Sequence, residues 1–306
     1  MNRRESNPPA PYELAVRPLA PAVFVTGKGG VGKTTVAAGL AVAAAEQGTG
    51  SIFVEFGDSD SGKVALAGAP SSVQYERIRP EEALVQGATP MFRSAWVARG
   101  VLGNFAMRPL LRAAPAVREV AMLEAVRRLM EQHPGHRVVV DMPATGHSLS
   151  WFAVAGQGRD LLVRGPLFEL CDRLVRELIH PGAMSIVVVT LPEPLVLRET
   201  RELCMALASR HQLPVDRLIV NRVPPTLPPA ALREARALAE GGGDLAEAAR
   251  ALMQVLTVRG QTRDAVLEVV SSSLGSKAPP LVLLPRAPED PDAATVARWL
   301  QKLEPR

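Results

Sequence analysis

The chain has 306 residues, of which 47% are hydrophobic and 22% charged, and its formal net charge is +4. This length and apolar content predict one α/β domain with insertions rather than two independent domains. No apolar run reaches the length of a membrane span, and so mild a positive charge is weak support for nucleic acid or anionic lipid as a ligand.

The N-terminal segment, residues 1–20, contains four prolines and no hydrophobic signal core, so we expect it to be a disordered tail. Residues 21–306 are expected to form the folded domain. Cys171 and Cys204 are far apart in the sequence and provide neither a disulfide framework nor a CxxC zinc site. This cysteine usage is typical of a reducing compartment and predicts a cytoplasmic protein.

The first predicted strand, residues 22–26, leads through a glycine-rich loop into an alanine-rich helix, residues 36–47. The spacing Gly27-x-x-x-x-Gly32-Lys33-Thr34 satisfies the phosphate-loop pattern between a strand and a helix. Glycines let backbone N–H groups turn toward phosphate oxygens, and the helix N-terminus adds partial positive charge. We expect Lys33 to contact the β- and γ-phosphates and the Thr34 hydroxyl to ligate Mg²⁺.

A second lysine, Lys28, follows the first glycine of this loop. The sequence Lys-Gly-Gly-Val-Gly-Lys-Thr resembles the deviant phosphate loop of the MinD/ParA/ArsA ATPases. The resemblance implies that Lys28 crosses a dimer interface and contacts the phosphates bound by the partner subunit. A cation supplied in trans stabilises transition-state charge only when two subunits close face to face. A solvated loop lysine is the alternative.

An acidic loop follows the second predicted strand, residues 51–56. In phosphate-loop ATPases an acidic residue at this point positions the attacking water, and Asp58 or Asp60 could serve. An ordinary turn is the alternative, because turns also use Ser, Asp and Gly. Glu55, inside the strand, is either a site residue or an edge position.

The next segments alternate between strand and helix. A short strand is predicted at 73–79, and helical sequence from 81 to 132, with turn residues at 87–90 and a break near Pro115. Four arginines of this segment are interpreted as a solvated helix face: Arg112, Arg118, Arg127 and Arg128.

The apolar strand 137–142 carries Asp141 near its carboxyl end, which faces the ligand crevice of an open α/β sheet. Asp141 is therefore expected to hold Mg²⁺ through water, with a capping role as the alternative. The following turn, residues 143–147, offers backbone N–H groups suited to sensing the γ-phosphate. His147 is interpreted as a packing or helix-start residue rather than as a catalyst.

The remaining elements continue this alternation. An amide such as Asn221, near the end of one strand, can donate to and accept from an adenine edge. Strands are predicted at 185–190, 217–223 and 281–284, and helices at 160–179, 195–211, 227–256 with a break at 241–243, 263–270 and 293–303.

With these elements placed, the chain resembles the ArsA branch, which comprises the arsenite-pump ATPase and the guided-entry ATPases that target tail-anchored membrane proteins. Four matches support this, of which the second corresponds to the family's switch II, although its proline is shifted. They are the loop at 27–35, Asp141-Met-Pro-Ala-Thr-Gly-His, the segment from Pro192-Glu193-Pro194 to Arg198-Glu199-Thr200, and Val220-Asn221-Arg222.

The resemblance implies a doubly wound, mostly parallel sheet of the P-loop NTPase type, with a helical insertion at roughly 81–132 and 150–181. It also implies ATP and Mg²⁺ as cofactors, Thr34 and Asp141 at the metal, Glu193 and Glu199 at an interface near the partner's nucleotide, and Asn221 at adenine. The base is covered by a loop at 284–287 that includes Pro285 and Arg286. The implied phosphate-loop residues are Gly27, Lys28, Gly29, Gly30, Val31, Gly32, Lys33, Thr34 and Thr35.

The sequence departs from the family pattern at three points, and these departures bear on whether the chain forms a symmetric homodimer. The first switch has Glu55-Phe-Gly-Asp-Ser-Asp instead of Asp-Pro-Ala-His, the proline of switch II is shifted, and the CxxC pair that staples a homodimer is missing. These features resemble the bacterial ArsA-like proteins that occur as two unequal chains. We therefore expect either a homodimer or a heterodimer with a second ArsA-like chain, in which this chain is weak or inactive in hydrolysis.

The predicted function is that of an ATPase whose opening and closing as a dimer controls binding of a client, such as a hydrophobic membrane-protein segment. Membrane contact would then occur only through clients, and nucleic acid is not an expected partner. A ParA/MinD-like positioning ATPase is the alternative, and arsenite transport is disfavoured because thiolates do not cluster. Apolar clusters of the helical insertion are more often core than groove; if a groove exists, its candidate residues are Trp96, Leu102, Phe105, Met107, Leu110 and Leu111.

Overall fold

Seven parallel strands form one sheet at the centre of the computed structural model, which describes residues 18–92, 115–143, 148–210, 212–224, 229–274 and 279–301. The order across the sheet is β3-β2-β4-β1-β5-β6-β7, so the first strand is central and later strands are added on both sides. The strands are β1 Ala22–Thr26, β2 Ser51–Phe56, β3 Val73–Ile78, β4 Arg137–Asp141, β5 Met184–Thr190, β6 Arg217–Val223 and β7 Leu281–Pro285.

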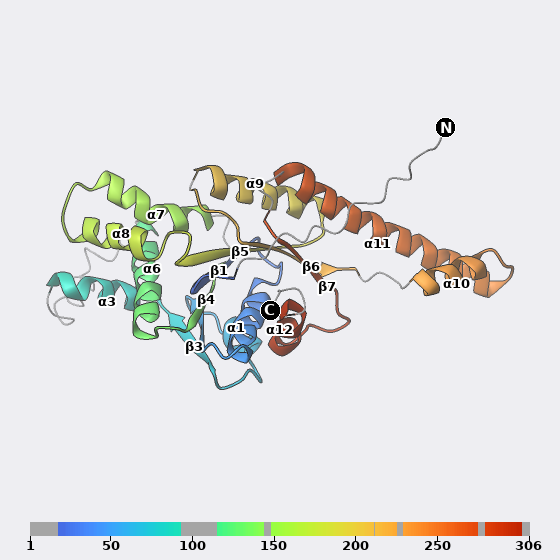
Figure 1. The fold of residues 1–306 in the computed structure, drawn as a ribbon, viewed down its shortest axis with the longest axis horizontal. Helices are drawn as coiled ribbons and strands as arrows, with labels where there is room; N and C mark the ends of the chain where they lie inside the picture. Colours follow the sequence, from blue (N-terminus) through green and yellow to red (C-terminus); the bar gives the residue numbers. More distant parts are fainter. Residues whose placement is uncertain are drawn as a thin grey trace.

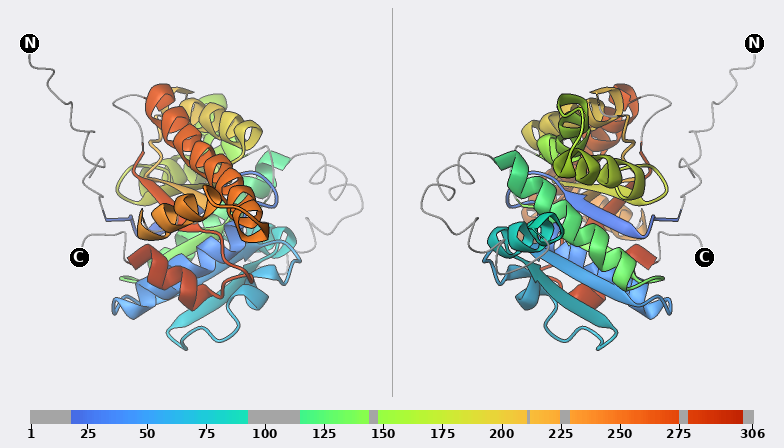
Figure 2. Two further views of the ribbon diagram at one scale, coloured as in Figure 1. Left: turned by 90° about the vertical axis from the view of Figure 1, so that its right-hand side faces the viewer. Right: turned by 90° about the vertical axis from the view of Figure 1, so that its left-hand side faces the viewer.

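Helices cover both faces of this sheet (Figure 1). The helices α1 and α12 pack on one face, and α6 to α9 lie on the other, while α10 and α11 extend away from the sheet (Figures 1 and 2). The helices are α1 Lys33–Glu46, α2 Ser61–Ala65, α3 Pro80–Phe92, α6 Pro115–Gln132, α7 Ser148–Leu161, α8 Pro166–Glu177, α9 Pro194–Arg210, α10 Pro229–Ala239, α11 Asp244–Leu274 and α12 Ala293–Gln301.

The central strand shows why these residues form this sheet. Side chains alternate along a strand, so Phe24 packs in the core beneath α6 to α9 while Val23 and Val25 pack in the core beneath α1 and α12. All five residues of β1 are buried, as expected for a parallel strand covered on both faces. The predicted α/β fold with a doubly wound parallel sheet is therefore confirmed.

Besides shifts of a few residues at element ends, three segments differ from the prediction. In the first two, a predicted helix divides or two predicted helices join. The segment 160–179 is not one helix, because Gly165, at a φ of 107°, and Pro166 end the link after α7 and start α8. The segments 244–256 and 263–270 are one continuous helix, α11. The short helix α2 was not predicted.

The third difference concerns residues 87–90, predicted as a turn but helical in α3. Pro90 has no N–H group to donate to the carbonyl of Gln86 four residues earlier, which would ordinarily interrupt the helix. In this fold the Nη1 of Arg128 on α6 donates to that carbonyl oxygen at 3.0 Å. A side chain from another helix thus satisfies the acceptor that the proline leaves open.

Arg127 corrects the interpretation of the α6 arginines as a solvated face, since only 8% of this residue is exposed. Its guanidinium binds the buried carboxylate of Glu124 through two hydrogen bonds, of 2.8 and 3.1 Å. Arg118 and Arg128 are half-buried, and Arg112 lies outside the described residues. The prediction of a solvated face was wrong for Arg127, because the helical pattern of apolar residues assigns every arginine to the surface.

Some predicted segments cannot be compared. The first 17 residues of the predicted tail, the six groove candidates and the turn residues 144–147 with His147 lie outside the described residues. At the end of the predicted tail, Leu19 packs against the core and the N–H of Ala20 donates to Ser185 Oγ. Within the described part of the chain, no helix is both long and apolar enough to cross a membrane.

Candidate nucleotide site

The glycine-rich loop follows β1 at the carboxyl edge of the sheet, where ligands bind in open α/β folds. Gly27, Gly30 and Gly32 have φ values of 145°, 80° and 89°, a backbone region that favours glycine. A Cβ atom at Gly27 would lie 2.1 Å from the carbonyl oxygen of Val189 on β5. The loop therefore needs glycine both for its backbone path and for its close contact with the neighbouring strand.

The loop ends at the N-terminus of α1, which no side chain caps and whose first turn holds no acidic residue. Unpaired backbone N–H groups at such a terminus favour an anion. Lys33, in this first turn, is only 6% exposed, and its Nζ donates to the carbonyl oxygen of Lys28 at 2.9 Å across the loop. Burial lowers the pKa of Lys33, while nearby Asp141 acts in the opposite direction.

Thr34 and Asp141, the two predicted metal ligands, are in contact although they are 107 residues apart. The Thr34 hydroxyl donates to Oδ2 of Asp141 at 2.6 Å. The second carboxylate oxygen, Oδ1, is buried and has no hydrogen-bond partner among the described residues. Burial raises the pKa of Asp141 to about 6, against the lowering effects of Thr34 and Lys33. A hydroxyl beside a buried, under-coordinated carboxylate fits a hydrated Mg²⁺ ion.

A cavity of about 530 Å³ adjoins the loop and runs between the ends of β5, β6 and β7. Asn221 lines this cavity, and its Nδ2 donates to the carbonyl oxygen of Val31 at 2.9 Å while its Oδ1 accepts from the N–H of Arg222. A cavity of this size, with a polar amide and several prolines, can hold a planar base. Its lining includes Gly32, Thr35, Val36, Leu191, Pro192, Glu193, Asn221, Arg222, Pro224, Pro285, Arg286 and Ala287.

Six of the predicted site residues thus lie together at this cavity: Gly32, Thr35, Glu193, Asn221, Pro285 and Arg286. Glu193, predicted near the partner's nucleotide, lies at the cavity of its own chain. The prediction omitted Arg222 and Pro224, which also line the wall. Arg222 belongs to the quoted motif Val220-Asn221-Arg222, but only Asn221 of that motif was assigned to the site.

Lys28 lies at the outer side of the loop and is paired within its own chain. Its Nζ contacts the Glu199 carboxylate of α9 at 2.8 Å, with side chains 46% and 45% exposed. Lys33 is buried by comparison, so the two lysines of the loop occupy different environments. The sequence singled out both Lys28 and Glu199 but did not predict that they pair with each other.

Asp58 and Asp60, the candidates for positioning water, are paired with two arginines, of which Arg77 lies in the edge strand β3 and Arg79 directly follows that strand. Asp58 accepts from Arg79 at 3.1 Å, and Asp60 pairs with Arg77. Within the described chain, neither carboxylate forms a hydrogen bond or ion pair with residues 27–35. Their exposed side chains are 86% and 69% accessible, typical of a solvated loop.

Glu55 explains how this acidic loop is attached to the sheet. The carboxylate is buried in β2, an internal strand, and accepts from the Ser61 hydroxyl, the Gly62 N–H and the Tyr75 hydroxyl. Burial alone would raise its pKa, but these hydrogen bonds hold the pKa of Glu55 below its usual value. Glu55 is therefore an anchor between β2, α2 and β3 rather than an edge residue.

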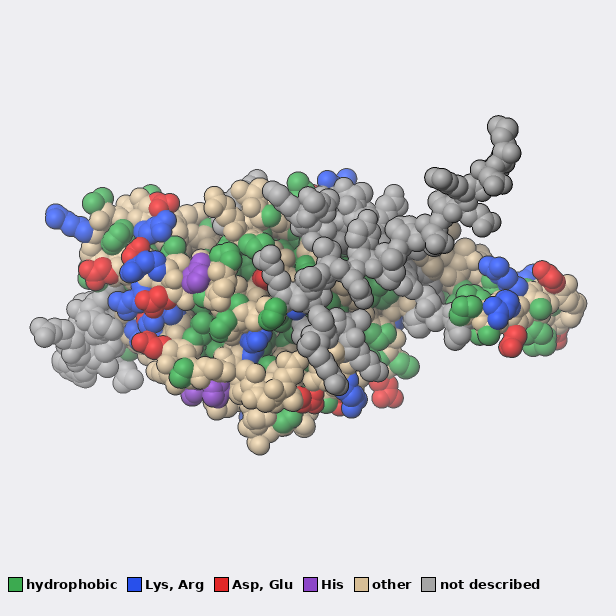
Figure 3. Space-filling model, viewed as in Figure 1, with side chains coloured by type: hydrophobic (Ala, Val, Ile, Leu, Met, Phe, Trp, Pro, Cys, Tyr) green, Lys and Arg blue, Asp and Glu red, His purple; other side chains and the backbone are tan. Residues whose placement is uncertain are grey.

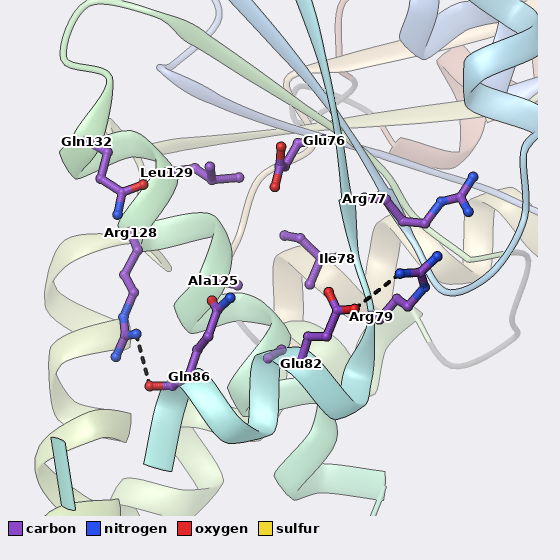
Figure 4. Close-up of a pocket in the computed structure, with 11 residues that line it drawn as sticks. Glu76, Arg77, Ile78, Arg79, Glu82, Gln86, Ala125, Arg128, Leu129 and Gln132 are labelled. Atoms are coloured by element: carbon purple, nitrogen blue, oxygen red, sulfur yellow. Dashed lines mark hydrogen bonds and ion pairs between the residues drawn. The ribbon is translucent and has the colours of Figure 1, made fainter. Parts of the chain in front are cut away.

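A second cavity, of about 410 Å³, lies between the edge strand β3 and the helices α3 and α6 (Figure 4). Arg79 at its rim binds Glu82 and Asp58, and Arg128 binds Glu124 and the Gln86 carbonyl. Its arginines are thus neutralised by groups of the fold. The described basic residues here do not form an anion site comparable to the phosphate loop.

Comparison with known proteins agrees with this geometry. Residues 22–245 match the family described as the CobQ/CobB/MinD/ParA nucleotide binding domain. The chain is 29% identical over 243 residues to the ATPase BagA of Mycobacterium tuberculosis, covering 72% of this chain and 70% of that protein. It is 28% identical over 193 residues to an arsenical pump-driving ATPase of Escherichia coli, covering 59% of this chain and 31% of that protein.

A third relative is an uncharacterized protein of Streptomyces coelicolor, 27% identical over 257 residues, with 79% of this chain and 60% of that protein covered. The family match spans the phosphate loop, Asp141 and Asn221, the residues that the fold gathers at one edge of the sheet. The chain therefore belongs to the CobQ/CobB/MinD/ParA family of nucleotide-binding P-loop domains.

Proposed function

We propose that this protein is an ATPase of the ArsA-like branch that works as an ATP-dependent dimer, in which Lys28 of each subunit contacts the phosphates held by the other. The position of Lys28 carries the proposal. Lys33 is buried and directed into its own loop, whereas Lys28 is half-exposed at the outer side. A second cation placed there can act on a triphosphate that a facing subunit presents.

Within one subunit, each group has a distinct task. The loop glycines and the α1 terminus bind phosphate oxygens, Lys33 neutralises their charge, and Asn221 with the surrounding cavity orients the base. Thr34 and Asp141 would hold Mg²⁺, which supplies charge neutralisation at the phosphates. Closure of two such sites excludes water and couples the nucleotide state to the shape of the dimer.

In the nucleotide-free state, Lys28 has a defined partner, the carboxylate of Glu199. An exposed ion pair contributes only about 0–1 kcal/mol, so releasing it toward a phosphate costs little. We propose that the output of this closure is binding of a client or partner protein, including a hydrophobic segment of a membrane protein. The similarity to BagA and to an arsenical pump-driving ATPase supports an ATPase but leaves the client open.

The test compares Lys28→Ala with Lys63→Ala, an exposed lysine on α2 that serves as the matched control. With a non-hydrolysable ATP analogue and Mg²⁺, Lys28→Ala should bind nucleotide but fail to dimerise in sedimentation velocity. Lys63→Ala should bind and dimerise as the parent chain does. Nucleotide-dependent dimerisation and full-rate hydrolysis by Lys28→Ala would contradict the proposal.

A further inference from the structure

The side chain of Asn221 links the strand β6 to the phosphate loop. Its Nδ2 donates to the carbonyl oxygen of Val31 at 2.9 Å, although the two residues are 190 positions apart in the sequence. Val31 is only 1% exposed and stands between Gly30 and Gly32, whose φ values are 80° and 89°. The amide therefore binds the loop between two residues with left-handed backbone conformations.

The Val31 carbonyl needs such a partner because of how a loop of this kind binds phosphate. Successive N–H groups in the turn can converge on an anion, and the carbonyl groups between them are then directed elsewhere. A buried carbonyl group without a hydrogen bond is unfavourable. Asn221 supplies the hydrogen bond at Val31, and Lys33 supplies one at the carbonyl of Lys28.

The amide of Asn221 is held in this orientation from its other side. Its Oδ1 accepts from the backbone N–H of Arg222 at 2.9 Å. The pairing of β6 with β7 is irregular between Val220 and Val223, and Arg222 within this irregularity has a φ of 59°. A bulged residue leaves its N–H out of the strand ladder, and a left-handed conformation is strained at any residue other than glycine. The irregularity thus makes the Arg222 N–H available to orient the Asn221 side chain.

The same amide lies directly against the start of α1. A Cβ atom at Gly32 would be 2.4 Å from Nδ2 of Asn221, and Gly32 is the N-cap residue of α1, without a side-chain hydrogen bond to the helix. Asn221 thus contacts the loop at two successive residues, Val31 and Gly32. Both residues immediately precede the helix terminus that favours an anion.

We propose that Asn221 is a positioning residue for the phosphates, which holds the loop in its anion-binding shape before a nucleotide arrives. This task is separate from any contact with the base, because it acts through Val31 and serves a ligand that has no base as well. Lys33 is not equivalent, since its amine is itself expected to bind the phosphates. The proposal rests on the proposed binding of phosphates by one subunit and not on the dimer.

The first experiment compares ATP with inorganic tripolyphosphate, which has the phosphates but no base, each in the presence of Mg²⁺. In Asn221→Ala the affinity for tripolyphosphate should fall about tenfold, and that for ATP by at least as much, because a hydrogen bond that shapes the loop is lost. A side chain that contacts only the base would leave the affinity for tripolyphosphate unchanged. Calorimetry measures both affinities.

Tripolyphosphate is a polyanion, so its binding has to be assigned to the loop. In Figure 3 basic side chains gather over α6 and α8 at one end of the molecule and over α10 at the other. Clusters of this kind attract polyanions without a specific site. The experiment therefore counts only the tripolyphosphate that ATP displaces.

The matched control is Gln301→Ala, which also removes an amide contact with α1. Gln301 Nε2 donates at 2.6 Å to Glu46, the last residue of that helix. This variant should bind both ligands as the parent chain does. Asn221→Leu keeps a side chain of similar size without a donor, and should lose affinity as Asn221→Ala does. Circular dichroism checks that each variant is folded.

The second experiment follows the loop itself by hydrogen exchange in the nucleotide-free protein. Exchange in residues 27–35 should be faster in Asn221→Ala than in the parent chain or in Gln301→Ala. Unchanged exchange, unchanged affinity of Asn221→Ala for tripolyphosphate, or a parent chain that does not bind tripolyphosphate would each overturn the proposal. A parent chain that binds both ligands without dimerising would contradict only the proposed function.

Discussion

Two buried charged clusters of this molecule, one at the nucleotide site and one on α6, are built in opposite ways. On α6, Glu124 accepts three hydrogen bonds from Arg127 and Arg128, and Arg127 also binds Glu131 and Glu177 of α8. At the nucleotide site, Asp141 accepts one bond from Thr34 and keeps a buried oxygen without a partner among the described residues.

The pKa shifts of the two buried carboxylates, Glu124 and Asp141, reflect this difference in hydrogen bonding. Burial would raise the pKa of Glu124, yet its arginines keep the pKa below the usual value, whereas burial raises the pKa of Asp141 to about 6. A saturated buried charge joins helices, here α3, α6 and α8. An unsaturated buried charge is unfavourable until a ligand completes it, which identifies the nucleotide edge as the place where this fold keeps binding capacity.

The largest effect is expected from breaking the α6 cluster. Glu124→Gln removes the buried carboxylate that Arg127 and Arg128 share, although Arg127 keeps its exposed partners Glu131 and Glu177. The substitution should lower the free energy of unfolding by about 3–5 kcal/mol. Urea denaturation followed by circular dichroism measures this. Glu131→Gln, whose side chain is 68% exposed, is the matched control and should cost less than about 1 kcal/mol. Equal effects of the two variants would show that burial at 124 is unimportant.

The next largest effect should be a stabilisation rather than a loss of stability. Since the folded-state pKa of Asp141 lies above the ordinary 3.8, ionisation of Asp141 weakens the nucleotide-free fold as pH rises through about 6. Asp141→Asn should therefore stabilise the nucleotide-free protein at pH 8, by roughly 2–3 kcal/mol, and leave it nearly unchanged at pH 4. Thermal unfolding at both pH values measures this.

The same variant separates stability from ligand binding. Asp141→Asn should lose the Mg²⁺-dependent part of its affinity for ATP, measured by calorimetry with and without the metal. If the variant is destabilised at pH 8, or binds ATP with Mg²⁺ as well as the parent, then Asp141 is not an unsatisfied charge kept for a ligand, and the two clusters do not differ as described.

A smaller effect is expected where the phosphate loop meets the base cavity. A Cβ at position 32 would lie 2.4 Å from Nδ2 of Asn221, while one at position 30 would meet nothing within 4 Å. Both glycines have a positive φ, so Gly30→Ala controls for backbone strain of about 1–2 kcal/mol. Gly32→Ala should cost more in unfolding free energy and weaken ATP binding further. Asn221→Ala should recover part of the extra stability loss, and its failure to do so would exclude the contact as the cause.

The smallest effect on stability should come from Lys28→Ala. Its ion pair with Glu199 is about half exposed, and such pairs contribute about 0–1 kcal/mol. Thermal unfolding without nucleotide should therefore change little, although ATP-dependent dimerisation should be lost. A large loss of stability in Lys28→Ala would mean that the lysine is chiefly structural.

These comparisons also show which parts of the fold and of the site could be predicted from the sequence alone. The strands and the phosphate loop were predictable, because β-branched runs and glycine spacing are local patterns, and the contact of Thr34 with Asp141 follows from two such patterns at one sheet edge. The burial of Arg127 was not predictable from the sequence, because its partner Glu177 on α8 lies 50 residues away. The pairing of Lys28 with Glu199 likewise depends on how α9 packs beside the loop, which no local pattern contains.

The contact between Arg128 and the Gln86 carbonyl has a consequence for variation at a distant position. A guanidinium performs the task of the amide proton that Pro90 lacks, so the proline in α3 and the arginine in α6 form one functional unit. Replacing Pro90 by an ordinary residue would restore the proton and leave Arg128 to Glu124 alone. Among descendants of this sequence, loss of the arginine should therefore be tolerated more readily after the proline has gone.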